Sequence, residues 1–313
     1  MGITQRGTMI LSNNPIFKRH VRKTPLLPLA EKENLFCKLE CCQVGGSFKI
    51  RGSLASLLAL DAEGNKKGVV TASMGNTATG LAYAGRLFQY PVTVVMPETV
   101  SATKLEATRR IGAEVILKGQ VGDDALKHSI KVAEDRDILF VHPHKTESFL
   151  DGNATIAREI MEENPAVKQI FIPIGGGGLA SGICRYIQNS GLSVVPIGVE
   201  AEMAPAFHQS FEKGRPVKLK AMDTIADALT LMEPDPEVFA YLYQHLEKVV
   251  TVPEKGIVRT MKLLYDEFRV TTEPGGAAPL AAMLNENPTV PSAAIISGGN
   301  ISQREFQKLI SGI

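Results

Sequence analysis

The 313-residue sequence contains no tryptophan, few aromatic residues (6%) and only four cysteines. Cys37, Cys41, Cys42 and Cys184 lack the paired CxxC spacing of a structural zinc site. We expect inert thiols in a reducing compartment rather than a disulfide framework.

An excess of charge of one sign is also missing, since 34 Lys and Arg residues face 33 Asp and Glu residues. No basic stripe interleaved with aromatic residues indicates a nucleic-acid partner, so a small molecule is the expected partner. No apolar run approaches the ~20 residues that span a bilayer. The first 20 residues also lack the apolar core of a signal peptide. We therefore expect no membrane association and a cytoplasmic location.

What the sequence does have is a globular composition, with 44% hydrophobic and 21% charged residues. The length allows a sizeable core and exceeds one typical domain unit. There is no linker rich in Pro, Ser or Gly and no repeat, so a division into domains must come from topology. The sequence ends at Ile313, soon after a glycine turn at residues 297–300. We expect no appended regulatory domain.

Short β-branched apolar runs alternate with helix-length segments along the chain. Continuous apolar runs suit parallel strands covered on both faces. Their alternation with helices predicts an α/β fold with right-handed crossovers. The expected strands include residues 68–71, 92–96, 114–117, 138–141, 170–174, 194–199 and 293–297. The expected helices include residues 76–88, 101–111 and 151–163.

Three glycine-containing turns follow expected strands, which is where ligands bind in open parallel sheets. The most informative is Gly175–Gly178 with Leu179, directly after the strand at 170–174. Its backbone N–H groups and the start of the next helix favour a phosphate-bearing ligand. It lacks both the Lys-Ser/Thr ending of a nucleotide P-loop and GxGxxG spacing. A plain strand-to-helix turn is the alternative.

The second turn covers residues 73–77 and the third covers residues 297–300. In the second, Asn76 and Thr77 could cap the following helix, or the exposed N–H groups could hold a carboxylate. The third places the Ser297 hydroxyl at the end of a strand. By itself this third signal is weak.

Lys49 lies between Phe48 and Ile50 and shortly after Gly45 and Gly46. A lone lysine is usually a solvated surface charge. An amine in apolar surroundings can instead have a depressed pKa and become a nucleophile. Composition alone leaves both interpretations open.

Taken together, these segments resemble the threonine/serine dehydratases, which are tryptophan-synthase-β-like (fold type II) enzymes that use pyridoxal 5′-phosphate (PLP). The matching segments run in family order from about residue 24 to residue 300. They are Lys38–Glu40, Gly46–Gly52, Pro173–Leu179, Thr224–Asp227, Glu273–Ala278 and Ser297–Asn300.

The resemblance implies two open parallel-sheet domains with the cofactor in the cleft between them. The large PLP-binding domain would combine residues 1–52 with residues 149–313, and residues 53–148 would form a small mobile domain. Homo-oligomers are usual in the family, so the resemblance implies a homodimer.

The resemblance also assigns site residues. Lys49 would be the catalytic Schiff-base lysine, Phe48 would pack against the cofactor, and Asn76 would hydrogen-bond the ring hydroxyl. Ser297 would contact the pyridine nitrogen. The phosphate would be held by the backbone of Gly175, Gly176, Gly177, Gly178 and Leu179. The substrate-binding turn would consist of Ser73, Met74, Gly75 and Thr77.

The implied activity is β-elimination from a 3-hydroxy amino acid, threonine-like or larger, giving a 2-keto acid and ammonia. Met74 stands where dehydratases and serine racemases usually have serine, which disfavours racemisation and makes the turn more apolar. The Gly75-Asn76-Thr77 string resembles β-replacement enzymes such as cysteine synthases, which is one alternative activity. A PLP-binding protein with altered or lost turnover is another alternative.

A cation site is the last point of comparison with this family. Metal-activated relatives bind a divalent ion with a glutamate at a strand end, a backbone carbonyl and an aspartate. Glu200 is retained here, but Ala206 occupies the aspartate position. We expect no tightly bound divalent metal, although Glu202 could substitute and carbonyls could bind a monovalent ion.

Overall fold

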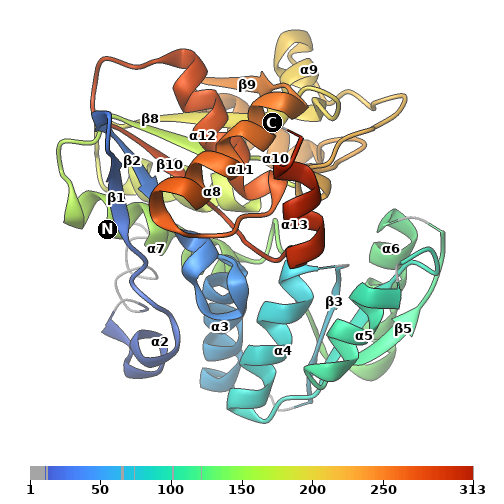
Figure 1. The fold of residues 1–313 in the computed structure, drawn as a ribbon. Coiled ribbons are helices and arrows are strands. Elements are labelled where there is room, and N and C mark those ends of the chain that lie inside the picture. The colour runs from blue at the N-terminus through green and yellow to red at the C-terminus, as the bar shows by residue number, and fades with distance from the viewer. Residues whose placement is uncertain are drawn as a thin grey trace.

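The computed structural model describes residues 11–312 except residues 12, 65–66, 74, 101 and 121. Its strands form two sheets (Figure 1), one with the order β1-β2-β10-β7-β8-β9 and one with the order β5-β4-β3-β6. Helices connect most of the strands, so the predicted α/β class is confirmed.

The elements have the following bounds. The strands are β1 (Leu26–Leu29), β2 (Lys32–Lys38), β3 (Val69–Ala72), β4 (Val92–Met96), β5 (Glu114–Leu117), β6 (Leu139–Phe140), β7 (Gln169–Pro173), β8 (Val195–Ala201), β9 (Lys248–Val252) and β10 (Ser292–Ile295). The helices are α2 (Pro15–His20), α3 (Lys49–Ala62), α4 (Asn76–Phe88), α5 (Ala102–Arg110), α6 (Gly122–Arg136), α7 (Glu147–Glu163), α8 (Gly178–Asn189), α9 (Ala206–Lys213), α10 (Pro236–His245), α11 (Glu254–Phe268), α12 (Pro274–Glu286) and α13 (Gln303–Ile310). Short 3₁₀ helices cover Glu40–Cys42, Val44–Gly46 and Asp227–Leu229.

The six-stranded sheet is parallel from β2 to β9, and only β1 runs antiparallel, at the edge beside β2. Pro28 lies in β1, which fits the preference of proline for edge strands because it cannot donate to a ladder. Apolar side chains from α7, α8 and α10 form a core with one part of this sheet. Side chains from α11 and α12 form a second core with it. The continuous apolar strands are thus covered by helices, as parallel strands require.

The four-stranded sheet is entirely parallel. Side chains of α3 and α4 share one core with β3 and β4, and α6 supplies the other core. Helix α3 packs against both α4 and α7, and Figure 1 shows α3 beside α4. A Cβ on Gly52 of α3 would overlap the Phe149 ring, and a Cβ on Gly152 of α7 would overlap the Arg51 carbonyl. These glycines therefore allow α3 and α7 to approach closely.

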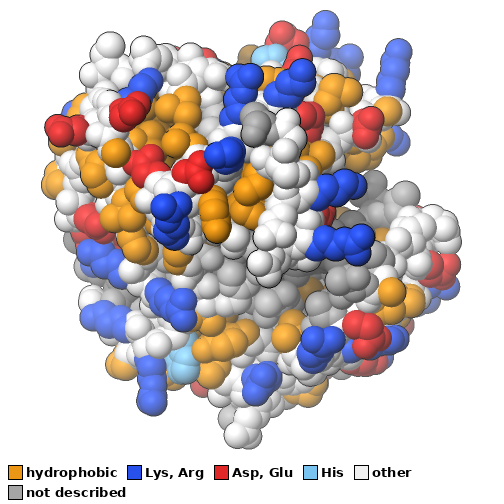
Figure 2. All heavy atoms as spheres, in the orientation of Figure 1, with side chains coloured by type: hydrophobic (Ala, Val, Ile, Leu, Met, Phe, Trp, Pro, Cys, Tyr) orange, Lys and Arg blue, Asp and Glu red, His pale blue; other side chains and the backbone are white. Residues whose placement is uncertain are grey.

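All strands of the four-stranded sheet fall inside residues 53–148, the expected small domain. The domain boundaries themselves stay a prediction. The cysteines are free thiols, with Cys37 and Cys184 buried and Cys41 and Cys42 half-buried. Figure 2 shows acidic and basic side chains interspersed over the visible face. In the part of the chain that the structure describes, no helix is long and apolar enough to cross a membrane.

Candidate active site

The predicted cofactor residues gather at the carboxyl edge of the six-stranded sheet. Strands β2, β10 and β7 are neighbours and run parallel. The chain leaves β2 toward Lys49, leaves β10 at Ser297 and leaves β7 at Gly175. Adjacent parallel strands end at the same edge, so their following turns converge, and this edge is where α/β proteins bind ligands.

Lys49 is the first residue of α3, and its side chain is half-buried. Its Nζ lies 4.7 Å from the centroid of the Phe48 ring. Burial lowers the pKa of Lys49 to about 8, while the negative charge of Glu273 opposes that shift. A lysine whose pKa is lowered by its surroundings has a larger neutral fraction near pH 7, and the neutral amine is the nucleophile and base. The structure thus supports the nucleophile interpretation of Lys49.

The segment before Lys49 is hydrogen-bonded along the 297–300 turn. The Phe48 N–H donates to the Ser297 carbonyl at 3.0 Å, and the Gly299 N–H donates to the Gly46 carbonyl at 2.8 Å. Gly46 has a φ of +74°, and a Cβ there would overlap the Asn300 side chain. Glycine at position 46 is therefore required both by its backbone conformation and by this close approach. The pairing fixes Lys49 beside Ser297.

The Gly175–Gly178 loop meets the rest of the protein at every glycine. A Cβ on Gly175 would lie 2.8 Å from the Ala228 carbonyl oxygen. On Gly176 it would overlap the His144 ring, and on Gly178 it would overlap the Pro143 carbonyl. Packing therefore demands glycine here, in addition to any demand from a ligand.

The N-terminus of α8 lies in the same loop. Its N-cap residue is Gly177, with a φ of +88° and no side-chain cap. The first N–H groups of a helix have no intrahelical partner, and together with the helix dipole they attract anions. The Leu179 side chain is buried in the core, so only its backbone can face a ligand. The loop fits the phosphate of PLP, and Lys49 and Ser297 fit its aldehyde and ring.

The predicted substrate turn follows β3, in the four-stranded sheet. The Ser73 hydroxyl accepts hydrogen bonds from the N–H groups of Gly75 and Ala78, both at 3.2 Å. Gly75 is exposed, Thr77 is buried, and Met74 lies outside the described residues. The position of α4 over α3 is set by Gly80, where a Cβ would lie 3.1 Å from the Lys49 carbonyl carbon. The turn is thereby carried close to the start of α3.

Asn76 connects this turn to the six-stranded sheet. Its Nδ2 donates to Glu273 Oε1 at 2.7 Å, and its Oδ1 accepts from Asn300 Nδ2 at 2.6 Å. An amide nitrogen carries two protons, so Asn76 has donor capacity beyond the bond to Glu273. The expected bond to the cofactor ring hydroxyl stays a prediction.

Two residues near Lys49 could not be given a chemical role from the sequence, although Glu273 begins one of the segments that match the family. Glu273 lies directly before α12. It accepts a hydrogen bond from Asn76, and its negative charge opposes the lowering of the Lys49 pKa. His144 follows β6 and lies against Gly176. A signal for His144 was present in the sequence, because it comes three residues after the expected strand 138–141. Its approach to a glycine 32 positions further along the chain could not be read from that signal.

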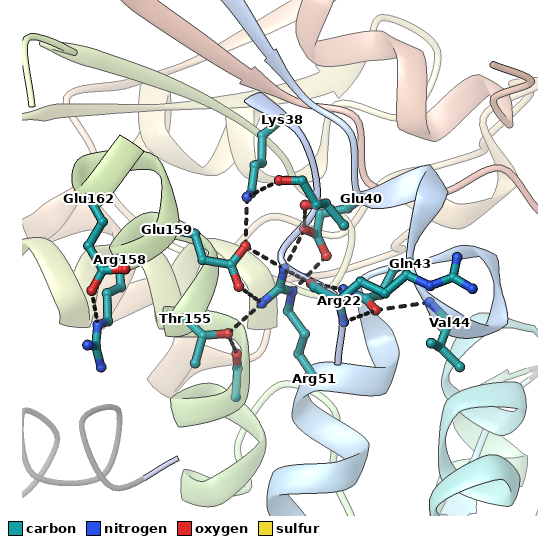
Figure 3. A network of polar contacts seen from close by, with 12 residues as sticks. Arg22, Lys38, Glu40, Gln43, Val44, Arg51, Thr155, Arg158, Glu159 and Glu162 are labelled. Atoms are coloured by element: carbon teal, nitrogen blue, oxygen red, sulfur yellow. Dashed lines mark hydrogen bonds and ion pairs between the residues drawn. The ribbon is translucent and has the colours of Figure 1, made fainter. Parts of the chain in front are cut away.

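A buried ion-pair network around Arg51 fixes the first turn of α3 (Figure 3). Arg51 donates to both carboxylate oxygens of Glu40, at 2.7 and 2.8 Å, and to both of Glu159, at 2.6 and 2.8 Å. Lys38 Nζ donates to Glu159 at 2.6 Å, and the Thr24 hydroxyl donates to Glu40. Two cations therefore face two carboxylates. Burial alone would lower the pKa of Arg51, but Glu40 and Glu159 outweigh burial and raise it.

Glu200 was considered as a cation ligand, but its carboxylate is hydrogen-bonded to the start of helix α9. Its Oε1 accepts from the Phe207 N–H at 2.9 Å and its Oε2 accepts from the His208 N–H at 2.8 Å. The carboxylate thus caps the start of α9. Burial raises the pKa of Glu200 to about 8, against the lowering effect of these N–H groups. Among the described residues, no group of three or more His, Cys, Asp or Glu residues is arranged to hold a metal ion.

Residues 17–298 match the family described as pyridoxal-phosphate dependent enzymes, so the chain belongs to this family and uses PLP. The L-threonine ammonia-lyase of Geobacter sulfurreducens is 36% identical over 97% of this chain and 77% of its own length. The phenylserine dehydratase of Ralstonia pickettii is 37% identical over 85% of this chain and 83% of its own length. The solved structure of processed threonine deaminase isoform 2 from Solanum lycopersicum has a TM-score of 0.87 and 28% identity, covering 99% of this chain and 94% of that one. The predicted family and cofactor are confirmed.

Proposed function

We propose that this protein is a PLP-dependent ammonia-lyase that eliminates water from a 3-hydroxy amino acid. The reaction converts threonine, for example, into 2-oxobutanoate and ammonia. Water leaves in the elimination and is taken up again when the released enamine hydrolyses, so no net water is consumed. The observation that carries the proposal is a half-buried lysine, Lys49, with a lowered pKa beside a phosphate-type loop. The chain that carries this lysine belongs to the pyridoxal-phosphate dependent enzyme family and is similar to threonine ammonia-lyases.

The residues of the chain divide the work as follows. PLP supplies the electron sink for the charge left on Cα when its proton is removed. Lys49 Nζ takes the Cα proton, and a pKa of about 8 suits a general base near neutral pH. The loop at Gly175–Gly178 and Leu179 would hold the phosphate. Ser297 would contact the ring nitrogen, and Phe48 would pack against the ring.

The substrate turn at residues 73–77 holds the substrate carboxylate in this proposal. Two features support a side chain larger than that of serine. Residue 74 is methionine, an apolar residue at the position where the resembled dehydratases usually have serine. A phenylserine dehydratase also stands among the relatives at 37% identity. Racemisation is disfavoured because the Met74 thioether cannot donate a proton.

The test is a product assay on purified PLP-loaded protein. The panel contains the L and D forms of serine, threonine, 3-hydroxyaspartate and 3-phenylserine, with O-acetylserine for replacement chemistry. Equal amounts of keto acid and ammonia from one 3-hydroxy amino acid support the proposal and name the substrate. If no member releases either product while the bound-PLP absorbance is present, the elimination proposal fails. A thiol co-substrate added with O-acetylserine then tests β-replacement.

We propose a homodimer in which residues 53–148 move as a small domain relative to residues 1–52 and 149–313. Closure would bring the 73–77 turn onto the substrate and exclude water. Light scattering of the protein as it leaves a size-exclusion column measures its mass in solution. The monomer mass of 33.8 kDa would reject the dimer.

A further inference from the structure

The residues after β6 form a tight turn that leads into α7. The Thr146 N–H donates to the His142 carbonyl at 3.0 Å, and the Thr146 hydroxyl accepts from the His142 N–H at 2.8 Å. Pro143 and His144 lie at the centre of this turn. The Pro143 carbonyl lies against Gly178, and the His144 ring lies against Gly176. The imidazole of His144 is therefore held against the loop that receives the phosphate.

The neighbouring histidine helps to hold His144 in place. The His144 N–H donates to His142 Nδ1 at 3.2 Å, and the two rings meet edge to face with centroids 5.2 Å apart. A ring nitrogen that accepts must be unprotonated. Burial, with the charge of Lys145, lowers the pKa of His142 to about 4, so His142 stays neutral at neutral pH.

The groups around His144 disfavour its charged form when no anion is bound. Burial lowers the pKa of His144, and the charges of Lys49 and Lys145 lower it further. Lys145 belongs to the same turn, while Lys49 approaches from the start of α3.

Three carboxylates moderate the positive charge of Lys145 and Lys49. Lys145 is paired with Asp235 at 2.7 Å and with Glu237 at 2.9 Å, both at the start of α10. Glu273 faces Lys49 from the start of α12. The field at His144 is thus set by Lys49 more than by Lys145, whose charge is neutralised nearby.

We propose that His144 is a ligand of the cofactor's phosphate group, neutral in the apoprotein and protonated when the phosphate is bound. A phosphate group carries a charge of about −1.5 to −2 at pH 7. An opposite charge within ~4–6 Å favours the protonated imidazole. The bound phosphate therefore adds a negative charge beside the imidazole, opposite in sign to the nearby Lys49 and Lys145. Binding of PLP is then coupled to the uptake of a proton at His144. This inference rests on the proposed placement of the phosphate at the Gly175–Gly178 loop.

Calorimetry on the apoprotein tests the proposal without measuring turnover. PLP and pyridoxal, which lacks the phosphate, are each titrated at pH 7 in two buffers with different ionisation enthalpies. The difference between the two ligands in protons taken up per ligand isolates the effect of the phosphate, because Lys49 reacts with both. Wild-type protein should show phosphate-dependent uptake of up to one proton.

His144→Phe and His144→Gln are the test variants, and His128→Asn, on α6, is the matched control. Both test variants should lose the phosphate-dependent proton uptake. His144→Phe should bind PLP about ten- to a hundredfold more weakly, which corresponds to one charged hydrogen bond, with unchanged affinity for pyridoxal. His144→Gln keeps a neutral donor and should lose less affinity. The control should behave like the wild type. Circular dichroism checks folding, and if the Phe variant does not fold, the Gln variant decides.

Two results would overturn the proposal, and they differ in what else they remove. If both test variants keep the wild-type difference between PLP and pyridoxal, His144 is not a phosphate ligand, and the glycine-loop site stands. If PLP and pyridoxal bind wild-type protein equally tightly with equal proton counts, the Gly175–Gly178 loop does not hold the phosphate. The proposed cofactor placement then fails together with this inference.

Discussion

The Glu273 carboxylate accepts a hydrogen bond from the Asn76 amide, with Oε1 and Nδ2 2.7 Å apart. The two residues are 197 positions apart and come from elements that flank different sheets. Glu273 also acts on Lys49, whose pKa it raises. One carboxylate therefore connects the turn after β3 with Lys49.

Glu273→Gln should change the pH at which PLP attaches to the apoprotein. Burial lowers the pKa of Lys49 to about 8 and Glu273 opposes the shift, so losing its charge lowers this pKa further. Because the neutral amine reacts, the rate of attachment should reach half its maximum at a lower pH. Stopped-flow absorbance of apoprotein mixed with PLP measures this midpoint. Glu305→Gln, an exposed glutamate on α13, is the control. Identical midpoints for Glu273→Gln and wild type would contradict the assignment.

Arg51→Met should strongly destabilise the apoprotein. The substitution leaves the buried carboxylates of Glu40 and Glu159 without their main partner, and breaking a buried pair costs about 3–5 kcal/mol. Urea unfolding gives the change in the free energy of unfolding. Arg158→Met removes a partly exposed i,i+4 pair with Glu162 and should cost only about 0.3–0.5 kcal/mol. Equal losses for the two variants would show that the network contributes no more than a surface pair.

Gly176→Ala should weaken PLP binding through His144. The added methyl overlaps the imidazole ring, so the turn after β6 or the glycine loop must shift. Overpacking of this kind costs about 1–3 kcal/mol of stability. The dissociation constant of PLP should rise more than that of pyridoxal. Gly122→Ala, where no heavy atom lies within 4 Å of the added methyl, is the control. Unchanged PLP affinity in Gly176→Ala would mean that this packing does not shape the phosphate site.

Among the strands, those predicted with the correct bounds are continuously apolar or β-branched in most of their residues. The structure has β4 at Val92–Met96 and β5 at Glu114–Leu117, and α4 at Asn76–Phe88, with the expected bounds. Helix α7 begins at Glu147 rather than at residue 151. Strands β1 and β2 were not expected, because β1 contains proline and β2 begins with Lys32, Glu33 and Asn34. Strand β9 was not expected either, although it contains a β-branched run at residues 249–252. Pairing with neighbouring strands contributes to the conformation of all three beyond their local sequence.

The residues of the site likewise divide into those with a local sequence signal and those brought together only by the fold. The glycine loop follows an expected strand, so it could be predicted from a local signal, whereas the roles of Lys49 and Ser297 were predicted only from the family resemblance. The contact of Arg51 with Glu159 spans 108 positions and that of Asn76 with Glu273 spans 197. No sequence pattern near either residue of these pairs predicts the contact. Hence the network under α3, the role of Glu273 and the position of His144 emerged only from the fold.

The proposed chemistry depends on Lys49, and chemical trapping of the cofactor identifies the lysine that binds it. The PLP-loaded protein is reduced with borohydride, digested and mapped by mass spectrometry, and Lys49→Ala and the control Lys32→Ala are treated in parallel. The reduced cofactor should be found on Lys49 alone. Lys49→Ala should carry no label and release no keto acid from the best substrate, while Lys32→Ala should match the wild type. A label on another lysine of wild-type protein, or normal turnover by Lys49→Ala, would contradict the proposed role of Lys49.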